Sequence, residues 1–232
     1  MITPIAVAKV QQQYPALTGD GNRTYLISTR AGQLFTAGWE TELILAGYGY
    51  NTHVFGITAG ADVLLVAGGG AGTVVNTDLP EMIVGTPTGY FHIPLSFRAT
   101  VQADHDADAD EANIILFADQ TKTAPSTATA TALTITPLMD GGRTSVSSGW
   151  HTCNTDDITD PVCTQLLGYA TNQAAQVDAS STAVSSLRLD YEPDYPVLLK
   201  GPCSVVACWG GTAALTGACT YCWAEVPISR YE

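Results

Sequence analysis

The sequence predicts an all-β fold of the sandwich or barrel type. Apolar and β-branched residues occur in short runs of strand length, and Gly, Pro, Asn, Asp or Thr separate these runs. A sustained helical period of apolar residues is hard to find. With 232 residues the chain is long enough to bury a substantial core. We therefore expect one large β domain.

The expected strands follow one another along the chain, and each is rich in branched or aromatic residues and ends at turn-forming residues. The glycine-rich segment VAGGGAGTVV (66–75) predicts a hairpin turn rather than a phosphate loop, because no basic residue and no helical pattern follows it. His53 and His92 fall inside strand-like runs and are interpreted as structural. The runs are 42–48, 52–58, 62–67, 72–76, 81–85, 90–101, 113–119, 131–136, 185–190, 196–199, 203–209 and 219–226.

Residues 1–32 differ from the rest, because they are polar, rich in turn residues and without a clear strand. They predict an extended N-terminal arm, and residues 33–232 form the expected β domain. Two further segments, 121–132 and 140–161, have the composition of loops, and the second is long enough to protrude. Scattered apolar residues give the arm anchors for docking on a neighbouring subunit: Ile2, Ile5, Val7, Val10, Tyr14 and Leu17.

The segment ADHDADADEAN (103–113) concentrates carboxylates in a chain that is otherwise poor in charge. Its aspartates begin with the spacing of a calcium loop, but Ala109 replaces the required glycine and Ile115 the required glutamate. Since the segment joins two expected strands, we interpret it as a solvated acidic turn. The alternative is a divalent cation that relieves the repulsion between carboxylates, with Asp104, Asp106, Asp108 and Asp110 as candidate ligands.

The six cysteines form two groups, one beside the loop NTDDITDPV (154–162) and one near the C-terminus. The C-terminal four lie in two expected strands around the turn GTAALTG (211–217). One hairpin register brings them together as two cross-strand pairs without a metal, as disulfides or close thiols, whereas tetrahedral zinc is the alternative. The expected pairs are Cys153–Cys163, Cys203–Cys222 and Cys208–Cys219.

Charge composition bears on partners and location. The formal net charge is −13, so most of the surface would repel a phosphate backbone, and we expect no direct binding of nucleic acid. The first residues do not have the pattern of a signal peptide, and His53, Asp62 and glycines interrupt the best candidate for a membrane span. We expect synthesis in a cytoplasm and no membrane attachment. An even cysteine count, however, suits an oxidising environment. A protein that is made in a cytoplasm and later leaves the cell in a particle released by lysis would meet both expectations.

The segment DYPVLLKGPCSVVACWGGTAALTGACTYCWAEVP (194–227) resembles the closing strands of jelly-roll virion proteins from tailed bacteriophages. TGYFHIPLSFRATV (88–101), followed by the acidic turn and NIILFADQ (113–120), is similar to the central strand pair of such a roll. In pattern the resemblance covers residues 33–230. It implies a jelly-roll sandwich that forms homotrimers and acts as a capsid decoration (cement) protein. The outer capsid surface of the virion is then its location, and the major capsid protein is its partner.

The function expected from these observations is structural. Neither a nucleophile elbow nor a His-x-x-x-His pair occurs, so we expect neither enzymatic activity nor a cofactor. The alternative is a head or tail appendage that binds host carbohydrate, with Trp150, His151 and the loop 140–161 as contacts. An exposed Trp150 would favour this alternative, and a buried one would not. A glycan-degrading enzyme would need two positioned carboxylates, and nothing in the sequence positions Asp156, Asp157 and Asp160.

Overall fold

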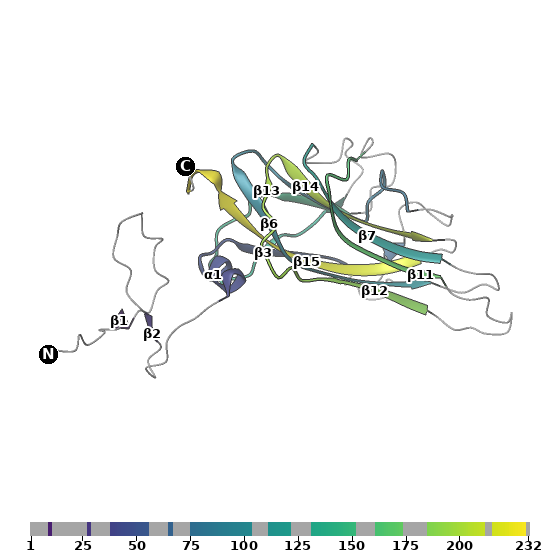
Figure 1. Ribbon diagram of the computed structural model, residues 1–232, viewed down its shortest axis with the longest axis horizontal. Helices are drawn as coiled ribbons and strands as arrows, with labels where there is room; N and C mark the ends of the chain where they lie inside the picture. Colours follow the sequence, from purple (N-terminus) through teal and green to yellow (C-terminus); the bar gives the residue numbers. More distant parts are fainter. Residues whose placement is uncertain are drawn as a thin grey trace.

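The computed structural model describes residues 9–10, 27–28, 38–55, 65–66, 75–103, 111–121, 131–151, 161–173, 185–211 and 215–230. In this part of the chain two antiparallel β-sheets pack face to face (Figure 1). The expected all-β sandwich is therefore confirmed. Within the same part no helix has the length and apolar character needed to cross a bilayer.

The two layers differ in strand order. The seven-stranded sheet follows the order β12 (Ser185–Tyr191), β6 (Tyr90–Ala103), β15 (Leu215–Pro227), β3 (Gly49–Val54) and β9 (Thr136–Pro137). Two short strands extend it, since β13 (Leu199–Lys200) pairs with β6 and β4 (Leu65–Val66) pairs with β15. The six-stranded sheet follows the order β11 (Gln165–Gln173), β7 (Glu111–Asp119), β14 (Cys203–Gly211), β5 (Met82–Thr86), β10 (Ser148–His151) and β8 (Thr131–Ala132).

The main core lies between the sheets and follows from the two-residue period of the strands. In β14 the residues Val205, Ala207 and Trp209 point into it, and in β15 Cys219, Tyr221 and Trp223 do so from the opposite sheet. Strand β14 is buried on both faces, because Val206 and Cys208 join Ile83 and Phe117 in a second cluster outside the six-stranded sheet. This double burial explains the uninterrupted apolar run at 205–209 within β14.

One predicted strand is a helix instead. Residues 42–48 were expected to be extended, but α1 (Trp39–Leu45) is helical, and Leu43 and Ile44 pack on the outer face of the seven-stranded sheet (Figure 1). A seven-residue helix is too short to display a clear apolar period, and its three consecutive apolar residues at 43–45 suggest a strand. Gly49 permits the close approach, since a Cβ there would lie 2.8 Å from the Ile44 side chain.

Four further differences concern strands. The loop expected at 140–161 contains β10, and β11 was not expected at all. The C-terminal hairpin was also wrong, because β14 and β15 belong to different sheets and do not pair. Within the expected arm, the two-residue strands β1 (Lys9–Val10) and β2 (Ile27–Ser28) pair in parallel. Most of the glycine-rich segment 66–75 lies outside the described residues.

Candidate functional site

No site can be described at the acidic segment. Asp104, Asp106, Asp108 and Asp110 lie outside the described residues, in the connection between β6 and β7. Where the chain is described, no three side chains of His, Cys, Asp or Glu gather in a group that could hold a metal ion. The cation alternative for the acidic segment stays a prediction.

The structure corrects the expected cysteine pairs. Cys203 and Cys219 lie between the sheets, whereas Cys208 lies outside the six-stranded sheet and Cys222 on the outer face of the other. None of these four is in a disulfide, and neither is the exposed Cys163, whose expected partner Cys153 lies outside the described residues. The expected hairpin register was wrong, because the chain crosses to the opposite sheet after β14. The same dispersion rules out one zinc ion shared by the four, and burial raises the pKa of Cys203 to about 12, which keeps that thiol protonated.

The other predicted contact residues are only partly placed. Val10 pairs with Ser28, and the remaining arm anchors Ile2, Ile5, Val7, Tyr14 and Leu17 lie outside the described residues. Trp150 is half-buried in β10 and packs against the cluster of Ile83, Phe117, Val206 and Cys208. It does not meet the condition of an exposed aromatic face. Burial lowers the pKa of the neighbouring His151. The carboxylates considered for glycan cleavage, Asp156, Asp157 and Asp160, lie outside the described residues.

The residues with the most unusual environment form a buried polar centre between the two sheets. Its members are Thr86, His92, Ser147, Tyr221 and Glu225, all less than 9% exposed. Thr86 ends β5 in one sheet, whereas His92, Tyr221 and Glu225 belong to β6 and β15 in the other. Ser147 directly precedes β10. The centre therefore links the two layers with polar contacts at a place where a sandwich ordinarily has apolar ones.

A β-bulge brings His92 into this interior. Cys222 pairs with Ser96 but Trp223 pairs with Pro94, so Leu95 is an extra residue in β6. Phe97 and His92 are an odd number of residues apart, so in a regular strand they would point to opposite faces of the sheet. The extra residue lets both point into the core. His92 therefore stacks beside the Tyr221 ring, with centroids 5.7 Å apart.

A chain of hydrogen bonds runs through His92. The Thr86 Oγ1 atom lies 2.7 Å from His92 Nδ1 and 2.6 Å from Ser147 Oγ, and His92 Nε2 lies 2.5 Å from the Tyr221 hydroxyl. Burial lowers the pKa of His92 to about 3, so the imidazole is neutral at ordinary pH. Burial also raises the pKa of Tyr221. Either tautomer satisfies the ring, because a hydroxyl can donate or accept at each nitrogen.

The Glu225 carboxylate completes the centre as an acceptor. Its Oε1 accepts from Ser145 Oγ at 2.5 Å and from the Trp223 indole N–H at 2.9 Å, and its Oε2 accepts from the Val146 backbone N–H at 2.8 Å. The Ser147 N–H also donates to Oε1, at 3.3 Å. Burial, followed by the charge of Glu225, raises the pKa of Tyr50 to about 12. Through the hydrogen bonds from Ser145, Val146 and Ser147, this carboxylate ties the segment 145–147 to β15.

This centre has hydroxyl, imidazole and carboxylate groups, but their arrangement is not that of a nucleophile activated by a base. Ser147 contacts Thr86 rather than His92, and His92, Thr86 and Tyr221 are fully buried. A substrate would have to separate the sheets to reach them. The contacts fit a structural bridge between layers, in line with the structural interpretation of His92. Sequence reasoning missed Glu225, whose signal was a lone charge on the same side of the strand as Tyr221 and Trp223.

The buried imidazole predicts a pH-dependent stability. Because the pKa of His92 is about 3 in the folded state and near 6.5 when unfolded, the unfolded chain binds more protons between these values. Its contribution is fully present above pH 6.5 and is lost as the pH falls toward 3, with a slope of up to about 1.4 kcal/mol per pH unit. Urea unfolding from pH 7 to pH 4 measures this loss.

A matched pair of variants separates this effect from that of other groups. His92→Gln should be less stable than the wild type at pH 7 but should show a shallower pH slope, because the buried titrating group is gone. His53→Gln is the matched control, because it replaces an exposed histidine in the same sheet without touching the buried hydrogen bonds. An equal slope in the wild type and in His92→Gln would contradict the assignment.

Comparison with known proteins adds no identification. No protein-family model matches the chain, and no curated protein matches it significantly.

Proposed function

We propose that the protein is a structural virion subunit, a jelly-roll decoration protein that binds the outer surface of a tailed-phage head as a trimer. The observation that carries this proposal is the pairing of its longest strands. Taken in chain order, the first of these pairs with the last, and the pairing continues inward: β3 with β15, β5 with β14, β6 with β12, and β7 with β11.

Nested antiparallel pairs of this kind arise when one long hairpin is rolled into two sheets. The strands β3, β6, β12 and β15 go to one layer and β5, β7, β11 and β14 to the other, and the chain changes layer at most of its connections. This arrangement supports a jelly roll, which is the architecture of many viral capsid and lectin domains. A fold alone does not define a function, so two surface features are needed as further support.

The first feature is the edge of the six-stranded sheet. Strand β11 has the uncharged sequence QLLGYATNQ and pairs with β7 on one side, and among the described residues it ends the sheet on the other. Its Leu166 and Tyr169 side chains are 56% and 53% exposed, and the nearby Val162 is 51% exposed. Natural edge strands usually carry charge or proline against unwanted pairing. We therefore assign this edge to the contact between copies of the chain in the trimer.

The second feature is charge. A net charge of −13 repels packaged DNA, which favours the outer face of the head over its lumen. The residues 1–32 would then reach from the trimer to the major capsid protein, where several weak anchors act together.

The test combines solution mass with binding. Light scattering of the purified protein is expected to give the trimer mass, and electron microscopy of empty phage heads mixed with it should show trimers at capsomer junctions. Leu166→Glu should shift the mass toward the monomer, because a charge enters the apolar contact. Leu198→Glu introduces the same charge at a similarly exposed leucine, 57% exposed, and should leave the trimer intact. A monomer at high concentration, or no binding to heads, would reject the proposal.

A further inference from the structure

We propose that the outer face of the seven-stranded sheet has a binding hollow for one acidic sugar unit, built by Arg98, Arg188, Thr100, Thr220 and Phe55. These residues line a hollow of about 260 Å³ together with Ala218 and Cys219. The inference does not depend on the proposed virion function, because it rests on the chemistry of this sheet face alone. The ligand class is a sugar ring that carries a carboxylate.

The strand register brings these side chains together. Across the sheet, Arg98 of β6 pairs with Asp190 of β12 on one side and with Thr220 of β15 on the other. In the next row, Thr100 lies between Arg188 and Ala218. Because successive residues point to opposite faces, Arg98 and Thr100 share the outer face, while Phe97 and Ala99 are buried in the core.

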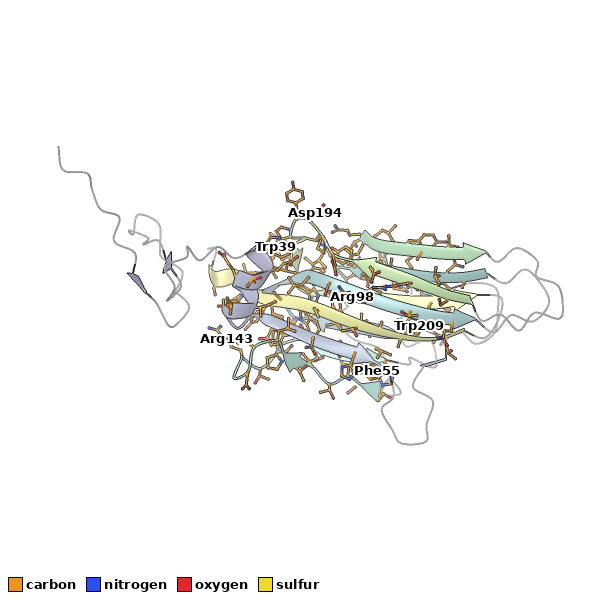
Figure 2. All side chains as sticks on the ribbon, turned by 90° about the horizontal axis from the view of Figure 1, so that it is seen from below. Trp39, Phe55, Arg98, Arg143, Asp194 and Trp209 are labelled. Carbon is orange, nitrogen blue, oxygen red and sulfur yellow. The ribbon has the colours of Figure 1, made fainter. Side chains whose placement is uncertain are left out.

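The hollow arises from a contrast in side-chain size. Thr100 and Ala218 are short and form its floor, whereas the long Arg188 borders it on the β12 side. Phe55 follows β3 directly and borders it on the opposite side. Figure 2 shows Arg98 and Phe55 on the two sides of β15. Pockets for drug-sized ligands have volumes of about 300–1,000 Å³, so a hollow of about 260 Å³ fits a single ring.

The two guanidinium groups are held in place by carboxylates. Arg188 makes two contacts with Asp190, with Nε at 2.6 Å and Nη2 at 3.0 Å from its oxygens. Arg98 donates from Nη2 to Glu192 Oε1 at 2.5 Å, and its Nε lies 3.9 Å from Asp190 Oδ1. A guanidinium has five N–H donors, so these carboxylate contacts leave donors for a ligand. Arginine matches a ligand carboxylate in a bidentate geometry, and two arginines beside one hollow favour an acidic ligand over a neutral one.

The remaining lining residues suit a sugar ring. The hydroxyls of Thr100 and Thr220 can donate or accept hydrogen bonds, as sugar hydroxyls require. The Phe55 ring offers an apolar face for the C–H groups of the sugar, and the His53 ring supports it at a centroid distance of 4.5 Å. Carboxylate, hydroxyl and apolar partners therefore converge on one small space.

Local charge also permits an anion here. The chain has nine Lys and Arg residues and a net charge of −13, so most of its surface repels anions. At this face Arg98 and Arg188 balance Asp190 and Glu192. An anionic ligand would thus meet a neutral patch with oriented donors.

The test is a titration of the isotopically labelled full chain, followed by the amide signals of Thr100 and Ala218, with glucuronate, glucose and acetate at equal ionic strength. Glucuronate is expected to bind at least about tenfold more tightly than either glucose or acetate. Equal binding of glucose and glucuronate would overturn the role of the arginines. Equal binding of acetate and glucuronate would overturn the sugar class.

Variants localise the site. Arg98→Gln and Phe55→Ala should each weaken glucuronate binding by at least about tenfold, which corresponds to about 1.4 kcal/mol. Thr100→Val, which keeps the shape and removes the hydroxyl, should weaken it less. Lys200→Gln removes a positive charge from the exposed side chain of β13 in the same sheet and should change nothing. Glucuronate binding that survives both Arg98→Gln and Phe55→Ala would place the ligand elsewhere and reject the proposal.

Discussion

Replacing Glu225 with alanine is expected to lower the free energy of unfolding by at least about 3 kcal/mol, because several donors then lose their acceptor inside the sandwich. The carboxylate accepts hydrogen bonds from Ser145, Val146, Ser147 and Trp223. A buried donor without a partner costs about 1–3 kcal/mol, and the Glu225 side chain that supplies the acceptor is only 2% exposed.

Two comparison variants make this expectation specific. Glu225→Gln keeps the shape and one oxygen but turns an amide N–H₂ toward a donor, so its cost should be smaller than that of alanine but still measurable. Glu192→Ala removes a glutamate whose side chain is 60% exposed and bonded to Arg98, and should cost no more than about 1 kcal/mol. Urea unfolding at pH 7 gives all three values. Equal losses for Glu225→Ala and Glu192→Ala would show that the buried centre does not stabilise the fold.

Trp209→Ala is expected to have a comparable effect, about 3–5 kcal/mol, because it removes one of the largest side chains of the core. Trp209→Phe should cost much less than this. The Trp209 indole nitrogen is buried and has no hydrogen-bond partner among the described residues, so phenylalanine removes an unpaired donor together with part of the volume.

The packing around Trp209 supplies a second measurement. A Cβ placed on Gly217 would lie 2.9 Å from the Trp209 ring, so the glycine leaves room for the indole of the opposite sheet. Gly217→Ala should therefore destabilise the wild type more than it destabilises Trp209→Phe, and the difference is the coupling between the two residues. Purely additive effects, or a Trp209→Phe variant as unstable as Trp209→Ala, would contradict this description of the core.

The sequence predicted strands best where they are buried. The runs at 81–85, 90–101, 203–209 and 219–226 correspond to β5, β6, β14 and β15, because burial selects branched and aromatic residues. The sequence did not predict strand β11, because its outward residues are exposed and a glycine interrupts its apolar pattern. The helix α1 is too short for its period to show.

The sequence could not predict to which of the two sheets each strand belongs. Strands β14 and β15 follow one another closely, so a hairpin was the simplest expectation, but the chain changes layer between them. Because β14 is buried on both faces, its composition does not indicate which side faces the core. The cysteine pairs depended on that hairpin and failed with it.

The buried polar centre could not be predicted for a different reason. His92 and Phe97 point into the same interior only because Leu95 is an extra residue in β6, and a bulge leaves no clear mark in the sequence. The hollow at Arg98 and Arg188 depends likewise on the register between β6 and β12. In both cases the sequence shows the polar residues themselves, but it does not show the strand pairing that brings them together.

The strand order also governs when the protein can fold during synthesis. Strands β14 and β15 come last in the chain, yet each lies inside its sheet, with β14 between β7 and β5 and β15 between β6 and β3. Neither layer has its full set of neighbours until residues 203–227 have left the ribosome. The emerging chain therefore exposes the apolar edges of β5 and β6 for most of its translation, and folding through such distant pairings takes about milliseconds to seconds. Chaperone binding to nascent chains that end before residue 203 is the expected consequence.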